Sequence, residues 1–176
     1  MRKILSFLAA FVLCFSLAAC GAEEAAAPAD PDAVTITVPA DMAGVSTEKD
    51  LKEQFSGEGY LDARLTDDGY VVLTMTREKH TALVADTERS IRESLEVLTA
   101  AEDNRFTKIE VNEDFTHYTV YIPGEELEAG ENFYSISFLF SSDLYYVVLG
   151  QEVPAVTVDY VNELTGEVIW TYPETA

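Results

Sequence analysis

The chain has little cysteine and little positive charge. Its 176 residues include two cysteines, and Cys14 lies inside the apolar run that opens the chain. If that run is removed, Cys20 alone remains, which excludes an intramolecular disulfide. Eleven Lys and Arg stand against 32 Asp and Glu, giving a net charge of −21. No basic stripe could neutralise phosphate, so we expect no nucleic-acid partner.

Recognisable catalytic and metal-binding motifs are missing as well. The chain has no G-x-S-x-G, H-E-x-x-H or G-x-x-x-x-G-K-[ST] motif, and its two histidines, His80 and His117, fall in separate predicted elements. We therefore predict no enzyme activity, no catalytic residue, no cofactor and no metal ion. Bound calcium at an acidic turn such as Asp67-Asp68-Gly69 is the alternative, although a hairpin turn explains the same residues.

The first twenty residues have the layout of an export signal. Arg2 and Lys3 precede an apolar run, 4–17, that is too short and wrongly flanked for a membrane span. The ending Leu17-Ala18-Ala19-Cys20 resembles the lipobox of bacterial lipoproteins, where cleavage occurs before a lipidated cysteine. We predict a signal peptide over 1–19 and lipid attachment at Cys20, hence a cell-membrane, extracytoplasmic location. The alternatives are an ordinary signal peptide with a chance cysteine, or Cys20 as half of a disulfide.

The charge of the remaining chain bears on how it would meet the membrane. Without 1–19, nine basic residues oppose 32 acidic ones, a net charge of about −23. Anionic headgroups would repel such a chain, so the lipid itself would have to hold it. Residues 20–33 are rich in Ala, Glu and Pro without apolar periodicity, which predicts a flexible tether. Residues 34–173 are expected to form a single α+β domain.

The pattern of that domain predicts a helix followed by a β-hairpin, three times over. A capping box at Thr47-x-x-Asp50 opens a short first helix. Thr76 can cap a second helix reaching about Ala101, along which one stripe recurs at three- and four-residue spacing: Val84, Thr87, Ile91, Leu95 and Leu98. The third helix, 131–149, is stopped by Gly150 and carries the same spacing in Phe133, Ile136, Phe140, Leu144 and Val148. Its segment 145–148 would also suit a strand.

Seven strands accompany these helices. A lead strand and three hairpins are predicted at 34–38, 60–65, 70–75, 106–112, 116–122, 156–161 and 167–172. Short links demand antiparallel pairing, so the fold class expected is α+β, with one mostly antiparallel sheet of about seven strands and three helices on one face. Apolar residues alternate with Thr and charged residues along the strands, as in a sheet solvated on one side.

The open face of that sheet is the candidate ligand-binding surface. Its threonines would be accompanied by an imidazole and several aromatic rings, contributed by Tyr60, Tyr70, Phe106, His117 and Tyr121. Exposed aromatics flanked by hydroxyls can grip a sugar, a peptide or a partner protein. The alternative is that Tyr and Thr occur there only because they are good strand formers.

Three sequence stretches are similar to small uncharacterised cell-surface lipoproteins of Gram-positive bacteria. They are Thr35-Ile36-Thr37-Val38-Pro39, then Thr74-Met75-Thr76 with His80, and 106–116. The resemblance implies a cell-surface address and assigns no activity or catalytic residue.

Two functions are therefore open. The first is a surface-tethered binding module whose open sheet face, or a groove beside the helices, meets an envelope protein, a peptide or a sugar. The second is a small hydrolase of an envelope polymer that uses a carboxylate pair. A hydrolase should have a deep pocket with two facing carboxylates, at least one with a raised pKa, whereas a binding module should have a broad surface without such a pair.

Overall fold

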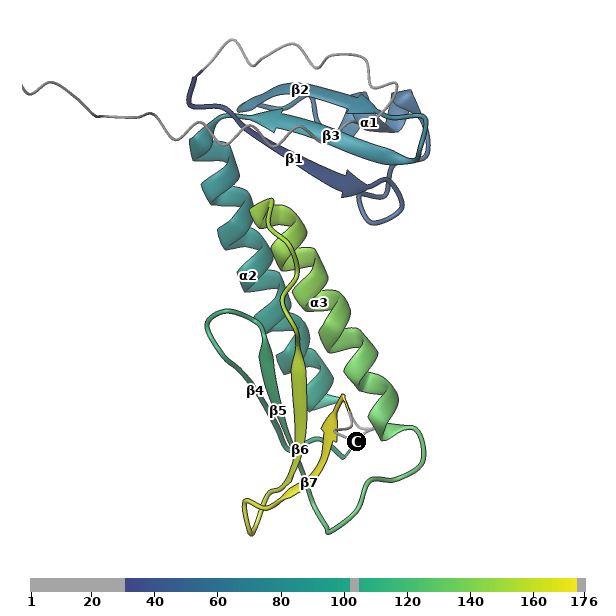
Figure 1. Ribbon diagram of the computed structural model, residues 1–176, viewed down its shortest axis with the longest axis vertical. Helices are drawn as coiled ribbons and strands as arrows, with labels where there is room; N and C mark the ends of the chain where they lie inside the picture. The colour runs from purple at the N-terminus through teal and green to yellow at the C-terminus, as the bar shows by residue number, and fades with distance from the viewer. Residues whose placement is uncertain (1–30, 102–104, 174–176) are drawn as a thin grey trace, which may run out of the picture.

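The protein is an α+β structure with two separate sheets (Figure 1). The computed structural model describes residues 31–101 and 105–173, and within them lie seven strands, three α-helices and one short 3₁₀ helix. The predicted signal peptide, Cys20 and most of the predicted tether lie outside the described residues.

The smaller sheet contains β1 (Val34–Pro39), β2 (Tyr60–Leu65) and β3 (Tyr70–Met75), in the antiparallel order β1-β3-β2. Helix α1 (Glu48–Gln54) covers it and buries Leu51. The predicted capping box is confirmed: the Asp50 N–H donates to Thr47 Oγ1 at 3.2 Å, and Thr47 Oγ1 donates to the Asp50 carboxylate at 2.9 Å. This sheet has a small apolar core of its own, formed mainly by Ile36, Val38, Val45, Leu51, Val71, Leu73 and Met75.

The larger sheet contains β4 (Lys108–Val111), β5 (His117–Ile122), β6 (Thr157–Asn162) and β7 (Val168–Tyr172), in the order β4-β5-β6-β7. Strands β5 and β6 are parallel, and the other pairs are antiparallel. Parallel neighbours need a crossover connection. Here that connection includes the 3₁₀ helix η1 (Glu131–Phe133) and helix α3 (Tyr134–Leu149).

The prediction of one seven-stranded sheet is wrong, and helix α2 (Arg77–Ala100) gives the physical reason. It begins directly after β3 and runs for 24 residues, which is about 36 Å at the rise of an α-helix. The chain is therefore carried away from the first hairpin before β4 begins, and the two sheets lie toward opposite ends of the α2–α3 pair (Figure 1). The order helix–strand–strand occurs three times, but only the second and third hairpins share a sheet.

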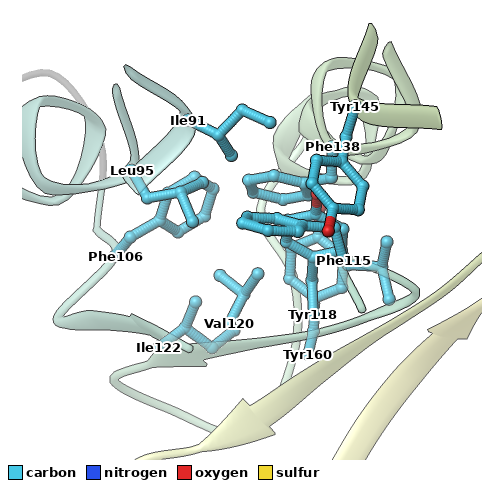
Figure 2. Packing of buried hydrophobic residues seen from close by; sticks show 11 residues of the cluster. Ile91, Leu95, Phe106, Phe115, Tyr118, Val120, Ile122, Phe138, Tyr145 and Tyr160 are labelled. Carbon is cyan, nitrogen blue, oxygen red and sulfur yellow. The ribbon is translucent and has the colours of Figure 1, made fainter. Parts of the chain in front are cut away.

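Helix α2 joins the larger core through the predicted stripe. Thr76 caps the helix by accepting from the Lys79 N–H at 3.2 Å, and Thr87, Ile91 and Leu95 are buried as expected. In Figure 2 Ile91 and Leu95 face the aromatic rings that fill this core. Several of those rings come from the sheet and from α3.

Helix α3 is also confirmed as a helix, and Gly150 ends it in the left-handed conformation at φ 70°. Three of the residues that predicted it nevertheless face solvent: Phe133, Ile136 and Phe140 are 69%, 62% and 53% exposed. The buried side of α3 is instead formed by Ser135, Phe138, Ser142, Tyr145 and Val148.

The two buried serines of α3 bond to tyrosines of the sheet. Ser142 Oγ donates to the Phe115 carbonyl at 2.6 Å and lies 3.1 Å from the Tyr118 hydroxyl. Ser135 Oγ lies 3.1 Å from the Tyr160 hydroxyl, which donates to a carbonyl of η1 at 3.0 Å. Burial raises the pKa of Tyr118 and of Tyr160. The core is thus aromatic and hydrogen-bonded, and it lies beneath the outer faces of β5 and β6.

Candidate functional site

The outer face of the larger sheet carries a row of polar side chains across all four strands. The strand register places Glu110 of β4 opposite Thr119 of β5, Thr119 opposite Asp159 of β6, and Asp159 opposite Thr171 of β7. The neighbouring positions along these strands, such as Tyr118, Val120 and Val158, are buried under the helices. Strand alternation therefore puts the polar row on the side away from the core.

Lys108, Glu110 and Tyr121 form one hydrogen-bonded group on this face. Lys108 Nζ lies 2.5 Å from Glu110 Oε1 and 5.2 Å above the centre of the Tyr121 ring, while the Tyr121 hydroxyl donates to Glu110 Oε2 at 2.9 Å. These bonds lower the pKa of Glu110, the Lys108 bond most, and raise the pKa values of Lys108 and Tyr121, whose partner is the Glu110 carboxylate. Both oxygens of Glu110 are engaged, so the three side chains hold one another in place.

His117, Asp159 and Thr171 form a second group. His117 Nε2 lies 2.8 Å from Asp159 Oδ2, and Thr171 Oγ1 donates to Asp159 Oδ1 at 2.6 Å. The carboxylate is mostly covered, whereas the imidazole is about half exposed. Among the described residues no hydroxyl or thiol is hydrogen-bonded to the imidazole, so this His–Asp pair lacks the nucleophile of a catalytic triad. It presents an oriented imidazole to solvent.

Two of the five predicted site residues, His117 and Tyr121, lie on this face, both from β5. Placing Phe106 with them was wrong, because its side chain is only 3% exposed. Its ring packs in the core, with its centre 4.9 Å from that of Tyr134. The regular pairing of β4 begins at Lys108, so the alternation of the strand does not extend back to Phe106.

Tyr60 and Tyr70 belong to the smaller sheet and do not join His117 and Tyr121. Tyr60 is half-buried, its ring edge-on to Phe55 with centres 5.4 Å apart and Lys79 Nζ 4.7 Å from its centre. Tyr70 is 42% exposed at the start of β3. The one open face expected from the sequence is therefore divided between two sheets.

A groove lies beside the polar face, between α2 and β4. Its volume is about 450 Å³, and it is lined by Arg92, Leu95, Glu96, Thr99, Ala100, Thr107, Lys108, Ile109 and Val111. Lys108 belongs both to this groove and to the group around Glu110. Sequence reasoning expected a groove beside the helices but named no residue of it. The sequence does not single out Arg92 as a groove residue, because it is one of many charged residues on the exposed side of α2.

In the described part of the chain, the shifted carboxyl pKa values do not favour a carboxylate-pair hydrolase. Among the described residues, two carboxyl groups, Asp50 and Glu110, have pKa values that clearly depart from the ordinary, and both are lowered by hydrogen bonds that favour the charged form. A general acid requires a shift in the opposite direction. Asp50 is occupied at the cap of α1, and Glu110 by Lys108 and Tyr121.

The described ranges, 31–101 and 105–173, contain no group of three or more His, Cys, Asp or Glu side chains placed to hold a metal ion. The turn Asp67-Asp68-Gly69, the alternative calcium position, is a hairpin turn in which the Gly69 N–H donates to the Thr66 carbonyl at 3.1 Å. None of the helices in the described part of the chain is both long enough and apolar enough to cross a membrane.

Comparison with known proteins adds no relative from which a role could be transferred. No protein-family model matches the chain, and neither does any curated protein or solved structure.

Proposed function

We propose that the chain is a lipid-anchored extracytoplasmic lipoprotein whose folded body binds a partner molecule at the outer face of the larger sheet. Cys20 is the point of attachment, residues 1–19 are the signal peptide, and residues up to 33 tether the body to the membrane. The partner is an envelope protein, a peptide or a sugar. The sequence supports this location, because Arg2 and Lys3, an apolar run and the lipobox-like ending at Cys20 follow one another in order.

The observation that carries the binding proposal is the pair of preformed polar groups on one exposed face. The Lys108–Glu110–Tyr121 group offers an ammonium and an aromatic ring, and His117 offers an imidazole that Asp159 orients. Side chains already fixed by their neighbours lose less conformational entropy when a ligand arrives. The hydrogen-bonded core beneath β5 and β6 supports the strands that carry His117, Tyr121 and Asp159.

The anchor is tested by Cys20→Ser. The variant should appear in the medium or accumulate as uncleaved precursor, whereas the wild-type chain should fractionate with membranes and incorporate labelled fatty acid. A mature Cys20→Ser chain that stays with membranes would show that something other than the lipid holds the protein.

The binding face is tested by comparing Tyr121 with Tyr70, because both tyrosines are candidate site residues in the sequence but they lie on different sheets. The detergent-solubilised mature chain is screened on arrays of glycans and of peptides, and each hit is measured again with Tyr121→Ala and Asp159→Ala. These two variants should lose binding. The matched control, Tyr70→Ala, removes an exposed tyrosine from the other sheet and should retain it. A hit that depends on Tyr70 and not on Tyr121 would place the binding surface on the smaller sheet.

A further inference from the structure

Strand β4 leaves one edge of the larger sheet without a paired strand among residues 31–101 and 105–173. It lies at the end of the order β4-β5-β6-β7, so β5 is its one neighbour. The Asn112 N–H donates to the His117 carbonyl of β5 at 3.1 Å. Lys108 and Glu110 lie four and two residues before Asn112, so their backbone N–H and C=O groups also point toward β5. In an antiparallel pair the alternate residues turn their N–H and C=O groups outward. Ile109 and Val111 are those residues, so their backbone donors and acceptors point to the free edge.

The groove between α2 and β4 runs along this same edge. Ile109 and Val111 line it from the strand, and Leu95 lines it from the helix. A molecule lying against the edge would therefore meet backbone hydrogen-bonding groups on one side and an apolar surface on the other. An extended polypeptide offers both kinds of contact, because its backbone can pair with an edge strand while alternate side chains enter a pocket.

The charge of the groove differs from that of the chain as a whole. The chain carries a net charge of −21, but the groove is lined by two cations, Arg92 and Lys108, and one acid, Glu96. The Arg92 guanidinium lies 4.9 Å from the centre of the Phe115 ring, and no carboxylate in the described part of the chain forms an ion pair with it. Since the ring holds the guanidinium without neutralising it, an incoming carboxylate would find an available cation.

We propose that the β4 edge binds an extended segment of another protein as a fifth strand of the larger sheet, with an apolar side chain in the groove and a carboxylate against Arg92. The proposal rests on the proposed binding function and names the class of partner, an acidic and extended peptide. A second copy of this chain fits less well than a short peptide, because two mature chains that each carry a net charge of about −23 repel one another, whereas a peptide brings only a few carboxylates.

The test uses a displayed library of random twelve-residue peptides, selected on the detergent-solubilised mature chain. Recovered peptides should alternate in polarity and contain Asp or Glu. Val111→Pro removes an outward N–H from an edge strand, where proline is tolerated, and should weaken binding about tenfold. Val111→Ala keeps the N–H and should weaken it less. Arg92→Gln should weaken binding about tenfold and reduce its salt dependence. Arg77→Gln, the same charge change at the far end of α2, should have no effect.

The outcomes separate this proposal from the function on which it rests. Peptides that tolerate both Arg92→Gln and Val111→Pro but are lost in Tyr121→Ala would overturn strand addition and leave the polar face as the binding surface. A library that yields no enriched peptide would overturn strand addition alone, since a sugar could still bind the face. Amide hydrogen exchange of β5 reports whether each variant is folded. If Val111→Pro unfolds, Arg92→Gln decides the matter.

Discussion

Helices α2 and α3 lie side by side over one face of the larger sheet (Figure 1). The side of α3 that is buried carries more hydroxyl groups than the buried side of α2. Helix α2 is charged on its outer side and turns Ile91 and Leu95 inward. Helix α3 turns Ser135 and Ser142 inward and leaves Ile136 and Phe140 exposed. The helix that is more apolar overall is therefore the one with the more polar buried face.

The sheet beneath the helices explains the difference. Under α3 lie Tyr118 and Tyr160, whose buried hydroxyls each need a hydrogen-bond partner. A serine supplies that partner and is small enough to leave room for the rings. Under α2 the neighbouring side chains include Phe106 and Ile109, whose side chains have no polar atom and pack through apolar contact. What a helix buries is thus set by the surface that receives it.

The largest difference in stability between variants of the two helices should come from placing a charge at an apolar position of each helix, buried in α2 and exposed in α3. Ile91→Asp or Leu95→Asp should destabilise the fold by about 3–5 kcal/mol, because an unpaired carboxylate would enter an apolar core. Phe140→Asp, on the outer side of α3, should change stability by less than about 0.5 kcal/mol. Urea denaturation of the three variants measures both. An equal loss in Phe140→Asp would mean that this side of α3 is covered and that the comparison fails.

A smaller loss should follow when a buried serine of α3 becomes more apolar. Ser142→Ala removes the partner of the Tyr118 hydroxyl and of the Phe115 carbonyl. It should therefore cost about 1–3 kcal/mol although the core becomes more hydrophobic. The adjacent Ser141→Ala, on the outer side, should stay within about 0.5 kcal/mol. A double-mutant cycle with Tyr118→Phe should show coupling, because the two hydroxyls act as one unit. No loss in Ser142→Ala would mean that apolar contact alone secures α3.

This pair of helices also marks how far the sequence could predict the fold. The elements followed from local signals, such as the caps at Thr47 and Thr76 and the glycine at 150. The buried face of α2 followed from its apolar stripe. The buried face of α3 could not, since a helix apolar on all sides has no preferred side until the tyrosines of the sheet select one.

The division into two sheets could not be predicted either, because local pattern identifies strands but not their partners. The parallel pairing of β5 with β6 depends on the α3 crossover. For the same reason the sequence placed His117 and Tyr121 on an open face but could not bring Asp159 or Thr171 to them from other strands. The groove at Arg92 likewise exists only once α2 lies beside β4.

The glycine that ends α3 should contribute a smaller amount to stability. Helix α3 ends at Gly150 with φ 70°, a conformation that costs an L-residue about 1–2 kcal/mol. Gly150→Ala should be destabilising by about that amount because of the positive φ, since a Cβ there would meet Ile36 Cγ2 at 3.4 Å, an ordinary contact distance. Gly57→Ala is the matched control, because Gly57 has no positive φ and a Cβ there meets nothing within 4 Å. Thermal unfolding compares the two, and equal melting temperatures would contradict the strained cap.

The smallest effect concerns two tyrosines of β5 that lie on opposite faces. The pKa of Tyr118 is raised mainly by burial, whereas that of Tyr121 is raised mainly by its hydrogen bond to the Glu110 carboxylate. Glu110→Gln should therefore lower the pKa of Tyr121 and leave Tyr118 unchanged. Titration of ring-labelled tyrosine by NMR would resolve the two. A shift of both rings together would mean that the outer face and the core respond as one network.

The same difference fixes the pH range in which each tyrosine contributes to stability. A tyrosine whose pKa is higher in the folded state than in the unfolded state binds its proton more tightly when folded. Its contribution is full below the unfolded value of about 10 and is lost as pH rises through the folded value. Stability should therefore fall as pH rises above about 10, and Tyr118→Phe should flatten that fall because the buried hydroxyl can no longer ionise. Glu110→Gln should change the slope far less, because Tyr121 is exposed and its bond to the carboxylate is screened by water. Urea denaturation at successive alkaline pH values measures both slopes, and a larger change in Glu110→Gln would place the stronger coupling on the outer face.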